Sequence, residues 1–218
     1  MYSLPVAHSN LIFSMSDAPP EASLMGVGKR SNPYPGVGFM GYADVLSFWF
    51  EEIEPKAWWA ADPAFDARVR ERFNETLLQA AQGECFGWRS EPHGRLAEII
   101  VLDQFSRNVY RGTARAFAQD PMALALAQEA VARKVHAELS PVARGFLFLP
   151  YMHSESRLVH QEAERLYREH ALADNHNFEL RHKAIVDRFG RYPHRNQILG
   201  RESSAEEMEF LKQPGSSF

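Results

Sequence analysis

The chain has 218 residues, 45% hydrophobic and 24% charged, a composition typical of a soluble protein with one globular domain. Its formal net charge of −4 excludes a bulk nucleic-acid-binding role, for which a basic domain is expected. A single cysteine excludes an internal disulfide and favours a cytoplasmic location. No apolar run approaches the roughly 20 residues that span a bilayer, so we expect no membrane association.

The first forty residues differ in composition from the rest of the chain. They are rich in Ser, Pro and Gly, as in the run SNPYPG at positions 31–36. A segment of this kind holds too few apolar residues to form a core. We therefore predict a flexible tail over residues 1–40 and a single all-helical domain over residues 41–218.

Proline follows a capping or acidic residue at four places, and each place predicts the start of a helix. The four lie at Asp62–Pro63, Glu91–Pro92, Asp120–Pro121 and Ser140–Pro141, and a capping box at Ser204–Glu207 predicts a fifth. Apolar residues recur at helical spacing between these starts, and no alternating run predicts a strand. The sequence therefore predicts an all-α fold, an antiparallel array of about seven to eight helices.

The helix expected over residues 94–107 is apolar on nearly every side, so it should lie in the centre of the molecule. Asp103 and Arg107 nevertheless fall on its apolar face, one turn apart. A buried ion pair is costly unless fully hydrogen-bonded. It is either a structural tie between helices or the floor of a pocket in which Asp103 orients Arg107 toward a ligand. Asn108 and Arg111 extend the polar run, which slightly favours the pocket.

Two further places carry residues suited to acid–base chemistry. His153 and Glu155 stand where a new helix is expected, with Ser154 as its N-cap, so His153 is either a capping group or a general acid or base oriented by a carboxylate. His182 lies on an apolar helix face, where a histidine is more often part of the core than a ligand-binding group. It remains a candidate for lining the same cavity.

A basic stretch near the C-terminus is the most informative feature of the chain. Between Arg181 and Arg201 there are six Lys or Arg residues and one acid, whereas the whole chain is negative. Gly190, Pro193 and Gly200 interrupt helical periodicity, so the donors stand in a loop, where binding residues concentrate. This local excess predicts a site for an anion. The candidate ligand-binding residues here are Arg188, Arg191, His194, Arg195, Asn196 and Arg201.

No metal ion or organic cofactor is predicted. The spacings between the possible ligands, such as His153, Glu155, His182 and His194, match no metal motif. The chain also lacks a glycine-rich phosphate loop, a dinucleotide fingerprint and a nucleophile elbow.

Several motifs together resemble a known family. They include Val45–Phe50 (VLSFWF), Leu102–Asn108 (LDQFSRN), Leu149–Glu155 (LPYMHSE) and Arg188–Asn196 (RFGRYPHRN). In this order they are similar to the bacterial family named domain of unknown function 924, over residues 42–218. The resemblance implies a fold of the tetratricopeptide-like helical class and brings no catalytic residues with it.

The leading hypothesis is a cytosolic helical domain with an Arg- and His-rich pocket for a small ligand that bears phosphate or carboxylate. Hydrolysis is one reaction that would fit, with His153 or His194 as acid or base and Glu155 as the orienting partner. The alternative is a tetratricopeptide-like module that binds a protein or peptide without catalysis. In that case the Arg and His residues would be internal ion pairs, and the Trp and Phe residues would form the binding surface.

Overall fold

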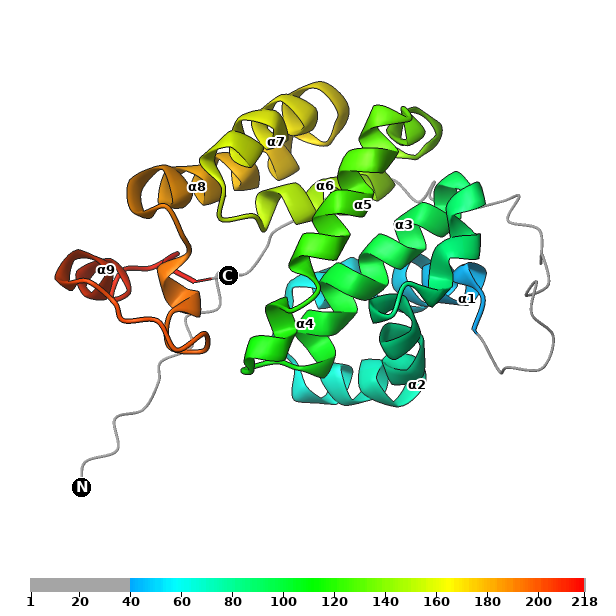
Figure 1. The fold of residues 1–218 in the computed structure, drawn as a ribbon, viewed down its shortest axis with the longest axis horizontal. Helices are drawn as coiled ribbons and strands as arrows, with labels where there is room; N and C mark the ends of the chain where they lie inside the picture. Colours follow the sequence, from blue (N-terminus) through cyan, green and yellow to red (C-terminus); the bar gives the residue numbers. More distant parts are fainter. Residues whose placement is uncertain (1–39, 218) are drawn as a thin grey trace.

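The computed structural model describes residues 40–217, which fold into nine α-helices without a β-strand in that range (Figure 1). The helices are α1 (Tyr42–Ser47), α2 (Pro63–Ala81), α3 (Pro92–Ile100), α4 (Ser106–Val109), α5 (Asp120–Ala132), α6 (Pro141–Met152), α7 (Arg157–His170), α8 (Ala173–Phe189) and α9 (Ala205–Phe210). The expected all-α array is confirmed. The predicted tail, residues 1–40, lies outside the described residues except for Met40.

The helix starts follow the local signals in the sequence. Asp62 caps α2 by accepting a hydrogen bond from the backbone N–H of Ala64, and Ser140 caps α6 in the same manner. Ser204 and Glu207 form the expected capping box at α9. The prediction that Ser154 caps the next helix is wrong. The cap of α7 is Ser156, two residues later, because its hydroxyl reaches the N–H of Val159.

One more helix is present than the upper limit of the sequence estimate, because the central helix is divided. A π turn, η4 (Val101–Phe105), separates α3 from α4, and the three segments run on without a break in chain direction from residue 92 to residue 109. A second π turn, η1 (Phe48–Glu52), continues α1. As expected, the central helix is buried: its apolar residues from Leu96 to Phe105 are at most 1% exposed.

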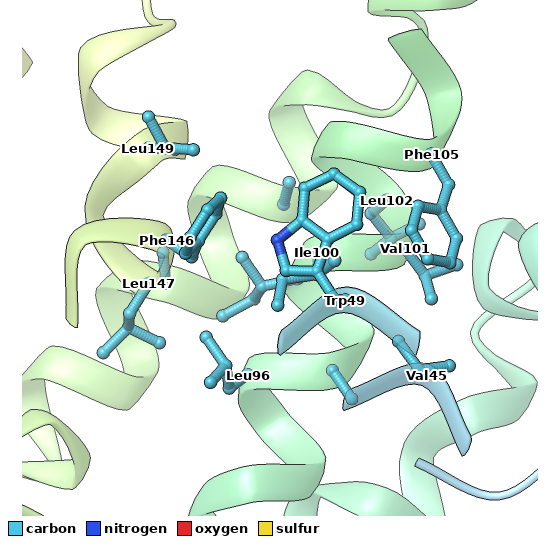
Figure 2. Close-up of a cluster of buried hydrophobic side chains, with 14 of the residues drawn as sticks. Val45, Trp49, Leu96, Ile100, Val101, Leu102, Phe105, Phe146, Leu147 and Leu149 are labelled. Carbon is cyan, nitrogen blue, oxygen red and sulfur yellow. The ribbon is translucent and has the colours of Figure 1, made fainter. Parts of the chain in front are cut away.

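The main hydrophobic core joins helices α1 to α7. Figure 2 shows Trp49 at its centre, with Leu96 and Ile100 of α3 and Phe146 of α6 around the indole. The ring of Trp49 meets Phe105 edge-on at a centroid distance of 5.5 Å, so the two π turns pack on each other through aromatic contact. Burying side chains of this size stabilises the fold by roughly 2–3 kcal/mol each. The aromatic residues around Trp49 therefore lie mainly in the core.

A second, smaller cluster holds the C-terminal part. Ile185 and Val186 of α8 pack with Tyr192, and Phe189 and Phe210 pack against them. This cluster fixes the loop of residues 190–201, which contains the short 3₁₀ turn η7 (Pro193–Arg195), against α8 and α9. In Figure 1 the α8 and α9 region lies on the far side of α6 and α7 from α1. Arg195 of this loop pairs with Asp120 at the start of α5. We call the polar residues along this boundary the polar seam: Asp103, Arg107, Asp120, His153, Tyr192 and Arg195.

No helix in the described part of the chain combines the length and the apolar character needed to cross a membrane.

Candidate functional site

The π turn η4 carries Asp103, the buried acid at the centre of the polar seam. Its side chain is 1% exposed, and its carboxylate accepts hydrogen bonds from Gln104 Nε2 at 2.5 Å and from His153 at 2.8 Å, with Arg107 Nη1 at 3.3 Å. Burial acts to raise the pKa of Asp103, but Arg107 and His153 outweigh burial and hold that pKa well below its usual range. Asp103 is therefore ionised. Single π turns within helices occur frequently at functional sites.

His153 ends α6 and points its ring at Asp103. Its Nδ1 lies 2.8 Å from Asp103 Oδ1, and its side chain is 13% exposed. Burial and the nearby Arg107 guanidinium lower the pKa of His153 despite the Asp103 carboxylate, so the imidazole is neutral at pH 7. Because an ionised carboxylate only accepts hydrogen bonds, Nδ1 carries the proton and Nε2 keeps its lone pair. The arrangement is that of a general base oriented by an acid.

Glu155 does not orient His153, contrary to the sequence-based expectation. Its carboxylate accepts two hydrogen bonds from Arg201, at 2.6 and 2.9 Å, and one from the backbone N–H of Tyr192 at 2.8 Å. The reason is geometric: His153 belongs to the end of α6, whereas Glu155 lies beyond a turn that faces the loop of residues 190–201. Glu155 and Arg201 therefore anchor that loop.

Arg107 binds across the seam and not mainly to Asp103. Its guanidinium forms a bidentate pair with Asp120, at 2.9 and 3.0 Å, and also donates to the Asp103 backbone carbonyl at 2.7 Å. Burial acts to lower the pKa of Arg107, but the carboxylates of Asp103 and Asp120 more than offset burial and raise it. The sequence predicts Asp120 only as an acid at the start of a helix. Its pairing with Arg107 leaves no sign in the local sequence pattern.

Arg195 is a buried guanidinium with few hydrogen-bond partners. Its side chain is 6% exposed and packs on the rings of Phe117 and Tyr192, with distances of 4.7 and 4.6 Å from Cζ to the ring centres. Its one side-chain ion pair, Nη1 to Asp120 Oδ2, is long at 3.4 Å, and its buried Nε finds no acceptor among the described residues. Burial and then the charge of Arg107 lower the pKa of Arg195. A buried donor without an acceptor costs about 1–3 kcal/mol, which an incoming anion would recover.

Tyr192 connects the parts of the seam. Its hydroxyl donates to the Met152 carbonyl at 2.5 Å and lies 3.1 Å from His160 Nε2. Its ring supports Arg195, and its backbone N–H is held by Glu155. The fully buried Tyr192 side chain therefore contacts two residues of interest. One is Met152, which precedes the candidate base His153, and the other is Arg195, the candidate anion-binding residue.

His160 and Glu179 form a buried pair behind Tyr192. His160 Nδ1 lies 2.7 Å from Glu179 Oε1, and Nε2 lies 2.9 Å from the carbonyl oxygen of Ser154. Burial raises the pKa of Glu179 despite its hydrogen bond to His160.

Two other predicted histidines lie beside the seam. His182 Nδ1 lies 2.8 Å from the Phe178 carbonyl, and its ring is 5.9 Å from that of Tyr192. His194 lies 5.6 Å from the Tyr192 ring, and burial together with the Arg195 charge lowers its pKa to about 3. Both histidines are therefore neutral at pH 7. Their neutrality leaves the arginines as the cations of the seam.

Other predicted site residues point elsewhere. Asn108 and Arg111 both bind Asp66 of α2, on a separate side of the central helix. Arg188 and Arg191 bind acids of α9, namely Glu206 and Glu207. Asn196 donates to Ser203 within the C-terminal loop. The expected convergence of all these side chains on one pocket is therefore wrong for these five.

The converging residues form a polar patch that is partly open to solvent. Arg107 and Asp120 are each 18% exposed, similar to His153. One hollow of about 470 Å³ lies between α3 and the end of α5, and another of about 50 Å³ lies beside α2 and Tyr110. Neither is lined by the seam residues. The described part of the chain also holds no group of three or more His, Cys, Asp or Glu side chains placed to bind a metal ion.

Comparison with known proteins assigns the chain to a family. Residues 45–215 match the model described as "Bacterial protein of unknown function (DUF924)". A solved structure of a protein of unknown function from Agrobacterium tumefaciens is 38% identical, with a TM-score of 0.75, and the match covers 78% of this chain and 96% of that one. No curated protein matches the sequence. Since the family model spans most of the chain, the resemblance seen in the motifs is confirmed, and the chain belongs to the DUF924 family of bacterial proteins of unknown function.

Proposed function

We propose that the protein binds a small anionic ligand at the polar seam and that His153 acts there as a general base. The observation that carries the proposal is Arg195, a buried guanidinium that packs on two aromatic rings, with a long Nη1 bond to Asp120 and no acceptor for its Nε–H among the described residues. Buried polar groups in natural structures are rarely left unsatisfied, and an ion, a ligand or a bound water commonly supplies the missing partner. Arginine is also the residue best suited to hold carboxylate or phosphate.

The Asp103–His153 pair supplies the chemistry in this proposal. Neutral His153 would accept a proton at Nε2 from a water molecule or a hydroxyl group of the ligand, and Asp103 would stabilise the imidazolium that forms. In this proposal Arg195 and Arg107 would stabilise negative charge on the reacting group. A hydrolase is the simplest reaction class with these parts.

A binding module without catalysis remains the second candidate, as tetratricopeptide-like helix arrays commonly offer such surfaces. Trp59 favours it, since it is a large aromatic residue that is 38% exposed and stacks on Phe146 at 5.8 Å. This candidate predicts no response to small anions. It also predicts a peptide-binding activity that Trp59→Ala would remove.

A thermal-shift screen with phosphorylated and carboxylated metabolites tests the anion site. A ligand at a hundredfold excess over its Kd stabilises the native state by about 2.7 kcal/mol, which raises the Tm of a domain of this size by roughly 5–10 °C. We expect one chemical class to give a dose-dependent rise. Arg195→Ala should abolish the rise, and Arg195→Lys should weaken it, because lysine keeps the charge but loses the planar fork.

The matched control is Arg188→Ala. Arg188 is an exposed arginine of the same basic stretch and binds Glu206, outside the seam. This variant should respond to the ligand as the wild type does. The proposal would be overturned by no shift across the panel, or by shifts that survive in Arg195→Ala.

A further inference from the structure

We infer that the seam selects a ligand group with a single negative charge, such as a carboxylate, over a dianionic phosphate, and that Asp120 sets this selectivity. The inference rests on the proposed function and names the ligand class of the same site. It follows from the balance of charges around Arg195 and from the position of Asp120 between two arginines.

The charged groups of the seam balance to zero without a ligand. Arg107 and Arg195 supply two positive charges, and Asp103 and Asp120 supply two negative charges. The two neighbouring acids have partners outside these four residues: Glu155 pairs with Arg201, and Glu179 is hydrogen-bonded to His160. The other neighbouring histidines, His153, His182 and His194, are neutral.

A monoanion would therefore bring the seam to a net charge of −1, and a dianion would bring it to −2. Charge repulsion is strong where water is largely excluded, as it is around side chains that are 1–18% exposed. The second charge of a phosphate would meet the Asp120 carboxylate, which lies within 3.4 Å of Arg195 and pairs with Arg107 as well. A carboxylate avoids this additional repulsion.

Of the two acids in the seam, Asp120 is the one that can be removed without losing the carboxylate that orients His153. Asp103 is needed to orient His153, whereas Asp120 accepts hydrogen bonds only from the two arginines among the described side chains. Asp120→Asn would change the empty seam from neutral to +1. The second charge of a phosphate would then be tolerated, so this residue is the predicted determinant of specificity.

Three small probes at pH 7.5 separate charge from shape: acetate is a planar monoanion, methanesulfonate is a tetrahedral monoanion, and methyl phosphate carries a tetrahedral dianionic group. The readout is the Nε–H signal of Arg195 in ¹H–¹⁵N spectra, assigned by its loss in Arg195→Lys. We expect acetate and methanesulfonate to bind about tenfold or more tightly than methyl phosphate, which is mainly dianionic at this pH. In Asp120→Asn, methyl phosphate should gain affinity more than either monoanion.

The controls distinguish the possible failures. Asp120→Glu keeps the charge and should keep the wild-type preference, and Asp187→Asn removes an exposed acid outside the seam and should change nothing. Methyl phosphate binding as tightly as acetate, or an unchanged preference in a folded Asp120→Asn protein, would overturn the selectivity while leaving the anion site standing. If no probe moves the Arg195 signal and no panel compound raises the Tm, the proposed function fails as well.

Discussion

At the scale of single residues, the structure turns an ion pair expected within one helix into a network across several. The shared face of Asp103 and Arg107 was predictable, because their spacing alone places them one turn apart. Their main partners, His153 and Asp120, come from elements whose positions depend on tertiary packing. His160, Glu179 and Tyr192 were missed for the same reason: a histidine, an acid and a tyrosine on helix or loop segments give no local sign of meeting.

The contribution of Asp103 to the stability of the fold can be measured directly. Asp103→Asn should lower the free energy of unfolding by about 3 kcal/mol or more, because it removes the charge from a buried, hydrogen-bonded acid and leaves Arg107 undercompensated. Urea denaturation followed by circular dichroism gives this value. The control is Asp187→Asn, which breaks an exposed i, i+4 pair with Lys183 and should cost about 0–1 kcal/mol. Equal losses in the two variants would contradict the network.

At the scale of elements, the helix starts were predicted well because capping is local, whereas the basic stretch was misjudged. The excess of positive charge lies in residues 181–201. The acids that neutralise part of this charge follow shortly after, in α9. Arg188 and Arg191 bind Glu206 and Glu207, so they secure α9 and do not serve the seam. Only Arg195, whose neighbours in space are Asp120 and aromatic rings, retains the predicted character.

The packing of the central helix gives a prediction at the same scale. A Cβ atom added at Gly94 of α3 would lie 2.1 Å from the Trp88 backbone oxygen, so Gly94→Ala must displace main chain. We expect a loss of roughly 1–3 kcal/mol in the free energy of unfolding. Gly145→Ala is the comparison, because its Cβ would meet only the side-chain amide of Asn175, which can rotate away. Chemical denaturation of both variants tests this, and a cheaper Gly94 substitution would be inconsistent with the close approach.

At the scale of the whole molecule, the fold class was predictable because helical periodicity and the family motifs agree over most of the chain. The position of the seam, by contrast, could not be predicted from the sequence. It depends on how the loop of residues 190–201 meets the start of α5, which local patterns do not encode. The C-terminal cluster of Ile185, Val186 and Tyr192 makes that meeting possible.

Whole-molecule stability should depend on pH in a defined direction. Burial lowers the pKa of His136, His153, His182 and His194 in the folded state, so the unfolded chain binds more protons as the pH falls below about 6.5. Their contribution to stability is therefore lost on acidification. Glu179, whose pKa is raised, acts in the opposite direction, but four groups outweigh one. The free energy of unfolding should fall by up to about 4 kcal/mol between pH 7 and pH 5.

Urea denaturation at a series of pH values measures this dependence. His194→Gln should flatten the curve, because it removes one of the four histidines that take up a proton on unfolding. A free energy of unfolding that stays constant or rises between pH 7 and pH 5 would show that these histidines are not held neutral in the folded protein.

The central claim is that His153 is a neutral base beside an anion-binding arginine, and the most direct test is ¹⁵N NMR of its imidazole at pH 7. The account predicts a protonated Nδ1 and an unprotonated Nε2 in the free protein, with the Nε2 signal shifting when acetate is added in the wild type but not in Arg195→Ala. A doubly protonated ring at pH 7, or an Nε2 signal that acetate leaves unchanged at concentrations that shift the Arg195 Nε–H signal, would contradict it.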